Sequence, residues 1–169
     1  MIPDEFQGAW RRVTLALDGG DEQADADALW LQATDDFADL RVDRTTGRLV
    51  SCFAGTTTWD PPWLRWSHAV DVGGAGVAAT DESRVTWDDD DLVERGVYVF
   101  PGTDGPVRYV ERWRRMPDDR PVRSLILPDG VLVEAGRHAL EIVRLEDTIS
   151  ATYRQRSPAG WQTERCFRQ

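Results

Sequence analysis

Residues 106–115 read Pro-Val-Arg-Tyr-Val-Glu-Arg-Trp-Arg-Arg, and this stretch indicates the fold class. Tyr109, Glu111 and Trp113 fall on one face of an extended chain, whereas the positions between them, mostly arginine, fall on the other. Such alternation with a period of two is typical of a β-strand whose two faces have different surroundings. Because large side chains occupy both faces, we expect this strand to carry the bulkiest side chains of its sheet.

The same alternation recurs along nearly the whole chain, and no window of eleven or more residues keeps a helical period. Turn-forming residues separate the alternating runs, as at Asp18-Gly19-Gly20, Asp60-Pro61-Pro62 and Pro128-Asp129-Gly130. We therefore expect an all-β chain of ten to twelve short antiparallel strands in one domain, residues 1–169. A closed barrel and a sandwich both satisfy this pattern.

The aromatic residues favour the barrel. Eight tryptophans are many for 169 residues, and several stand next to arginine, as do Trp10, Trp66 and Trp113. A barrel wide enough to enclose a cavity needs inner side chains that combine bulk with polarity. We predict a single antiparallel up-and-down β-barrel of about ten strands.

The charge and composition exclude several functions. The chain has a formal net charge of −10, all 20 basic residues are arginine, and both lysine and asparagine are missing. Catalysis that requires a lysine Schiff base, a phosphate-loop lysine or a Cys-His-Asn triad is therefore excluded. We also expect no nucleic-acid partner, because binding to phosphates depends on a basic surface.

Nothing in the sequence predicts a membrane partner or export. No apolar run approaches the roughly 18 residues that a membrane-spanning helix needs. The first residues, Met1-Ile2-Pro3-Asp4-Glu5, are acidic where a signal peptide is basic. We expect a cytoplasmic protein, either a monomer or a homodimer.

A family resemblance is carried by Gly8-Ala9-Trp10 at the start of the first long strand and by the arginine-rich end, Arg165-Cys166-Phe167-Arg168. With these motifs the chain resembles the calycin superfamily of lipocalins, fatty-acid-binding proteins and nitrobindins. The resemblance implies that Trp10 closes one end of the barrel and that Arg165 or Arg168 packs across its ring. The glycines that follow this tryptophan in haem-binding nitrobindins are absent, since Arg11 and Arg12 come next.

Further short motifs are similar to those of uncharacterised bacterial lipocalin-like proteins. They include Trp30-Leu31-Gln32, Phe53-Ala54-Gly55 and Tyr109-x-Glu111-x-Trp113. The likeness covers most of residues 8–115, while residues 116–169 match only in strand pattern.

The candidate site consists of aromatic and polar residues near the middle of the expected strands, where inward polar side chains need partners. A buried glutamate with a raised pKa is suited to acid/base chemistry, with His68 as its partner and Arg41 as an anion clamp. The catalytic candidates are Glu111, His68 and Glu94. An alternative is that the charged members form cross-strand ion pairs of purely structural importance. The expected ligand-binding residues are Trp30, Arg41, Phe53, Trp66, His68, Tyr109, Glu111 and Trp113.

We expect no metal site and no cofactor. The only histidines are His68 and His138, and neither is close in sequence to a cysteine. If haem were bound, His138 would be its candidate ligand. However, a lone histidine beside Arg137 is more typical of a partly exposed position.

Gly74-Ala75-Gly76-Val77-Ala78-Ala79 formally fits a dinucleotide-binding pattern, but no helical pattern follows it. We interpret this segment as a loop at the mouth of the barrel.

The leading functional hypothesis is an intracellular carrier or sensor that holds an apolar or aromatic small molecule in the barrel lumen, with Arg41 or His68 fixing a polar group. One alternative is a barrel enzyme, an isomerase, cyclase or hydratase, that uses Glu111 and His68 as acid and base. Another is a protein interaction module that binds no small ligand and presents its acidic first half to a partner.

Overall fold

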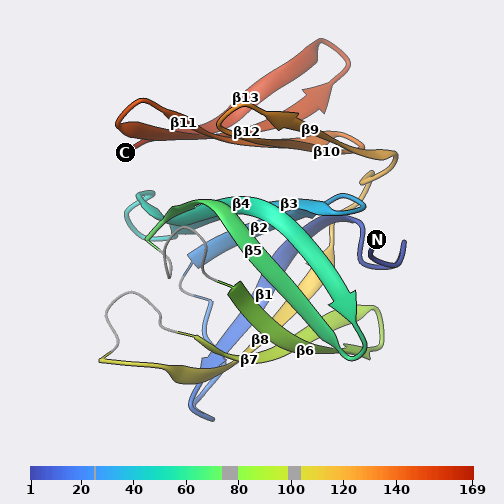
Figure 1. The fold of residues 1–169 in the computed structure, drawn as a ribbon, viewed down its shortest axis with the longest axis vertical. Helices are drawn as coiled ribbons and strands as arrows, with labels where there is room; N and C mark the ends of the chain where they lie inside the picture. The colour runs from blue at the N-terminus through green and yellow to red at the C-terminus, as the bar shows by residue number, and fades with distance from the viewer. Residues whose placement is uncertain (25, 74–79, 99–103) are drawn as a thin grey trace.

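The computed structural model describes residues 1–24, 26–73, 80–98 and 104–169, and these form thirteen β-strands (Figure 1). The first eight strands are β1 (Gly8–Leu17), β2 (Ala26–Gln32), β3 (Asp36–Asp43), β4 (Leu49–Asp60), β5 (Trp63–Val72), β6 (Thr80–Asp88), β7 (Asp91–Tyr98) and β8 (Val107–Arg115). The other five are β9 (Val122–Leu127), β10 (Gly130–Ala135), β11 (His138–Leu145), β12 (Thr148–Ser157) and β13 (Gly160–Arg168).

Strands β1 to β8 form a closed up-and-down barrel. Each pairs antiparallel with the next, and β8 returns to pair with β1, from Trp10 opposite Arg115 to Leu17 opposite Tyr109. Closure removes the unpaired strand edges that an open sheet would expose. The predicted all-β antiparallel barrel is confirmed, with eight strands rather than about ten.

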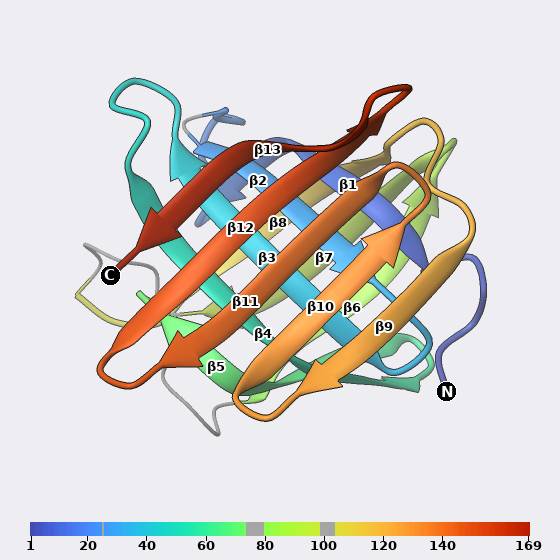
Figure 2. The ribbon, with the colours of Figure 1, turned by 90° about the horizontal axis from the view of Figure 1, so that it is seen from above.

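Residues 116–169 do not contribute to the barrel. Strands β9 to β13 form a separate five-stranded antiparallel sheet in the order β13-β12-β11-β10-β9. This sheet lies over β2, β3 and β4, and its strands cross them steeply (Figure 2). A sequence with alternating apolar and polar residues is compatible both with a further strand of the barrel and with a strand of a second sheet. The pattern therefore could not show that residues 116–169 form a separate sheet.

Two apolar cores result, one inside the barrel and one between the barrel and the sheet. In β2, Trp30 faces the barrel interior, while Leu29 and Leu31 point outward to the sheet. From the sheet, Leu140 and Ile142 meet them. Each fully buried leucine contributes about 2 kcal/mol to stability relative to exposure. The outer face of β2 to β4 is therefore part of a core and is not a solvent-exposed surface.

Trp10 is buried in the barrel core, near the start of β1 and opposite Arg115 at the end of β8. Its Nε1–H donates to the carbonyl of Phe6 at 2.9 Å, and the guanidinium of Arg115 lies 4.2 Å from its ring centroid. The expectation that Arg165 or Arg168 would cover this ring is wrong. Arg165 instead pairs with Asp27 at 2.8 Å, and Arg168 is exposed. β8 is the last strand of the barrel, so the arginine that covers the ring of Trp10 comes from β8 and is Arg115.

Of the β-bulges in the described barrel strands, two affect charged side chains of the barrel interior. The register of β1 against β8 shifts between Arg12 and Thr14, so that Arg12 and Leu15 both lie opposite inward-facing residues of β8. Strict alternation had placed these two on opposite faces. A bulge inserts an extra residue and so reverses the alternation beyond it.

The second bulge lies between β4 and β5, where Gly55 pairs with His68 but Ala54 pairs with Val70. Trp66 and His68 face the barrel interior, whereas Val70 packs against the outer sheet. Strict alternation would put Val70 on the same face as His68, and the bulge reverses that order. Asp71 is turned inward in its place, with its side chain 1% exposed.

The loop predicted at Gly74–Ala79 lies outside the described residues. Among the residues that are described, no helix is long and apolar enough to cross a membrane.

Candidate functional site

The structure brings the sequence-predicted site residues together inside the barrel. Their side chains come from β2 to β5, β7 and β8, and all are buried except Arg41, whose side chain is 12% exposed. They are Trp30, Arg41, Phe53, Trp66, His68, Glu94, Tyr109, Glu111 and Trp113.

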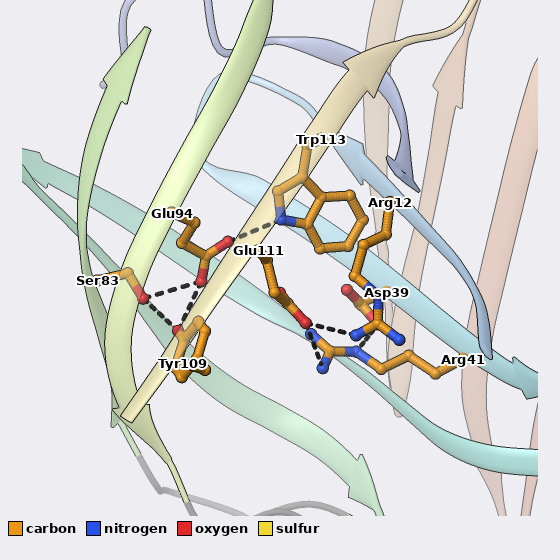
Figure 3. A network of polar contacts seen from close by, with 8 residues as sticks. All are labelled: Arg12, Asp39, Arg41, Ser83, Glu94, Tyr109, Glu111 and Trp113. Carbon is orange, nitrogen blue, oxygen red and sulfur yellow. Dashed lines mark hydrogen bonds and ion pairs between the residues drawn. The ribbon is translucent and has the colours of Figure 1, made fainter. Parts of the chain in front are cut away.

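Ion pairs link Glu111 to two arginines (Figure 3). Its Oε1 accepts a hydrogen bond from Nη1 of Arg12 at 2.5 Å and another from Nη1 of Arg41 at 3.3 Å. Arg41 also donates through Nε to Asp39 at 3.0 Å. Burial raises the pKa of Asp39, while the charge of Arg41 opposes that rise. Glu111, which sequence reasoning took for an acid or base, is thus engaged in a buried ion-pair network.

Glu94 has a different environment, made of neutral donors (Figure 3). Its Oε1 accepts from the hydroxyls of Ser83 at 2.8 Å and Tyr109 at 2.7 Å, and its Oε2 accepts from Nε1 of Trp113 at 3.0 Å. The hydroxyls of Ser83 and Tyr109 also contact each other. Burial raises the pKa of Glu94 to about 8, with a further contribution from the nearby Glu111. Glu94 is therefore mainly protonated at pH 7.

His68 is held by a carboxylate and an aromatic ring. Its Nδ1 lies 2.7 Å from Oδ2 of Asp71, and its ring stacks on Phe53 with centroids 4.7 Å apart and 11° between planes. Because a carboxylate accepts, Nδ1 carries the proton. Nε2 is buried and has no hydrogen-bond partner among the described residues. In the neutral ring this nitrogen is an acceptor.

Asp81, at the start of β6, is a further carboxyl group on the barrel interior. Burial raises its pKa to about 6, although the charges of Arg41 and His68 lower it in part. Its Oδ1 is buried without a hydrogen-bond partner among the described residues, and the same holds for Oε2 of Glu111. Buried polar atoms are nearly always satisfied by protein or water, so each such atom requires an explanation.

A small cavity lies between these groups. About 20 Å³ is open to the centres of water-sized molecules, which is room for one such molecule. The aromatic walls are arranged edge to face, with the centroid of Trp30 5.9 Å from that of Trp66 and 5.8 Å from that of Trp113. The cavity is lined by Trp30, Phe37, Asp39, Arg41, Phe53, Trp66, Asp81, Glu94 and Trp113.

His138 lies apart from this site, on β11. It is buried, in contrast to the partly exposed position expected from its neighbour Arg137. Nδ1 contacts the hydroxyl of Tyr153 at 2.8 Å, and Nε2 contacts the carbonyl of Pro117 at 3.0 Å. A haem iron at His138 would have to displace one of these partners, so the residue does not fit that group. The described residues contain no group of three or more His, Cys, Asp or Glu suited to a metal ion.

Sequence reasoning missed several residues of the interior, namely Arg12, Asp71, Asp81 and Ser83. The bulges explain Arg12 and Asp71, because strict alternation counted from Leu15 and from His68 assigns them to the outer face. Asp81 and Ser83 alternate with Val85 along β6, and this alternation is the signal that would have found both.

A solved structure has a similar fold. It is the uncharacterised protein YLR301w of Saccharomyces cerevisiae, with a TM-score of 0.74 over 95% of this chain and 85% of that chain. The two sequences are 13% identical, so the likeness extends to the fold alone. No protein-family model matches the chain, and no curated protein matches its sequence.

Proposed function

We propose that the chain is a small-molecule binding protein, a carrier or sensor, built on a calycin-type barrel with its ligand in the lumen. The observation that supports this most is the cavity, since aromatic walls meet there with Asp81, whose Oδ1 has no hydrogen-bond partner among the described residues. The calycin assignment is supported by the closed eight-stranded barrel and by the arginine stacked on Trp10.

Unsatisfied polar atoms favour a ligand because leaving them bare is costly. A buried donor or acceptor without a partner costs about 1–3 kcal/mol. Asp81, Glu111 and His68 each contribute one such atom inside the barrel. A bound molecule, or water in its place, would recover that energy.

The anchoring groups differ from those that the sequence favoured. Arg41 is already occupied by Asp39 and Glu111, so its guanidinium is less available to a ligand. Asp81, which lines the cavity, keeps a carboxylate oxygen open, and the indole rings of Trp30 and Trp66 line the same cavity. A small polar head matches this cavity, and an apolar remainder of the ligand requires that neighbouring side chains move aside.

Native mass spectrometry of protein purified from its own organism, compared with the denatured mass, tests the proposal. We expect a bound mass that is released on denaturation. Trp66→Phe should weaken rebinding several-fold, because the indole lines the cavity, while Trp161→Phe on the exposed edge of the outer sheet should not. Equal affinities for both variants would contradict a lumen site.

A second candidate is a barrel enzyme that uses acid/base chemistry, favoured by the protonated Glu94 and the dyad of His68 with Asp71. Because Glu111 is ion-paired, Glu94 replaces it as the acid in this hypothesis. An enzyme predicts that Glu94→Gln abolishes turnover of the released compound while its binding persists. Unchanged turnover would exclude this role. If the native mass equals that of the protein alone and no added compound binds, the result would instead favour a protein interaction module.

A further inference from the structure

We propose that the barrel interior binds a small organic cation, a protonated primary amine, with its ammonium group beside Asp81. This inference rests on the proposed small-molecule function and names the chemical class of the ligand. It is carried by the hydrogen-bonding character, the charge and the walls of the cavity.

The unsatisfied oxygens of the interior are acceptors. They are Oδ1 of Asp81 and Oε2 of Glu111, and both belong to carboxylates. Asp81 lines the cavity itself, and the Glu111 side chain lies between Glu94 and Arg41 (Figure 3), which also line it. A ligand that satisfies such atoms must bring N–H or O–H donors. A primary ammonium brings three donors and no acceptor.

The charge around the cavity favours the same ligand. Asp39, Asp71, Asp81 and Glu111 are carboxylates, whereas the guanidinium groups are those of Arg12 and Arg41. With Glu94 counted as neutral and the charge of His68 set against that of Asp71, the interior, among the described residues, keeps one more carboxylate than guanidinium groups. An anion would face this excess, and the donors of Arg41 already point to Asp39 and Glu111. A ligand with one positive charge reduces this excess of negative charge. The attraction between opposite charges is strong in a buried site, because the dielectric constant there is low.

The walls suit a cation as well as an apolar chain. Trp30, Trp66 and Trp113 surround the cavity together with Phe53. The faces of aromatic rings attract cations, most strongly for tryptophan. The cavity has room for one water-sized group, which an ammonium head fills. Longer chains therefore have to displace side chains, and we expect short alkylamines to bind first.

The experiment is a calorimetric titration with three probes of nearly equal size, propylammonium, 1-propanol and propionate. For the wild-type protein we expect propylammonium to bind at least tenfold more tightly than 1-propanol, and propionate not to bind. Asp81→Asn should reduce the affinity for propylammonium at least tenfold. Asp90→Asn, which removes one exposed carboxylate on the turn between β6 and β7, should leave it unchanged.

The comparison of probes on the wild-type protein does not depend on how the variant folds. If 1-propanol binds as well as propylammonium, or if Asp81→Asn keeps full affinity, the cationic class is wrong and the small-molecule function stands. If no probe binds but the native protein carries another compound, the inference again fails alone. If no probe binds and native mass spectrometry shows no bound compound, the inference and the proposed function fail together.

Discussion

Replacing Glu94 by glutamine is expected to make the stability of the protein less dependent on pH. The carboxyl group is fully enclosed by Ser83, Tyr109 and Trp113. A protonated Oε1 can donate to one of the two hydroxyls, because hydroxyls rotate to accept, while Oε2 still accepts from the indole N–H. The amide of glutamine repeats this arrangement with its NH₂ toward the hydroxyls. The amide side chain of the Glu94→Gln variant therefore mimics the neutral acid and cannot ionise.

The magnitude follows from the displaced pKa. Burial raises the pKa of Glu94 from 4.5 to about 8. Between these values the folded protein keeps a proton that the unfolded chain has lost, so the free energy of unfolding falls as the pH rises. The full effect is about 5 kcal/mol, from 1.36 kcal/mol per pKa unit, and it is complete once the pH exceeds the folded pKa. That amount is comparable to the whole stability of many domains, about 5–15 kcal/mol.

Urea denaturation at intervals from pH 4.5 to pH 9, followed by tryptophan fluorescence, measures this effect. We expect the wild type and Glu94→Gln to be similar near pH 4.5 and the variant to become progressively more stable up to about pH 8. Asp81 gives both proteins a shared decline at lower pH, since burial raises its pKa to about 6. Glu164→Gln, at an exposed position, should follow the wild type. Parallel curves for the wild type and Glu94→Gln would refute the assignment of a buried, protonated Glu94.

Three further substitutions test other parts of the structure by urea denaturation at pH 6. Arg115→Met should lower the free energy of unfolding by about 2 kcal/mol, because it removes the cation over Trp10 and the hydrogen bonds to the N-terminal segment. A decrease below about 0.5 kcal/mol would argue against a stabilising role of Arg115 at this end of the barrel. Arg12→Met should cost about 3–5 kcal/mol, since it leaves Glu111 with one guanidinium, and a neutral result would mean that the pair is not buried. Leu140→Ala should cost about 2–5 kcal/mol, whereas a sheet that is not packed on the barrel would tolerate it.

The sequence was sufficient to predict the strands and most of the inner face. The alternation of Tyr109, Glu111 and Trp113 placed these three on one side, and all three face the barrel interior. It did not reveal that the chain leaves the barrel after residue 115. Period-two alternation reports that a strand has two different faces, but the partner of each face depends on contacts far away in sequence.

The charged residues of the barrel interior were harder to predict from the sequence than the aromatic ones. Arg12 and Asp71 face inward because each lies next to a bulge, and a bulge leaves no clear mark in the alternating pattern. The role of Glu111 was misjudged because the sequence does not show that Arg12 reaches it. A carboxylate between two guanidiniums behaves as an ion-pair partner, whereas Glu94, among neutral donors, retains its proton.

The outer sheet accounts for only one face of the strands that it covers. It lies over β2, β3 and β4, so these strands are apolar on their outer face. Inward they supply aromatic rings such as Trp30 and also the ion pair of Asp39 with Arg41, while β6 and β7 supply the carboxyl groups of Asp81 and Glu94. Of the groups that line the cavity, Asp81 has the carboxylate oxygen without a partner among the described residues. An ammonium group beside Asp81 satisfies that oxygen, whereas an uncharged apolar ligand would leave it bare, which is why the amine is the stronger expectation.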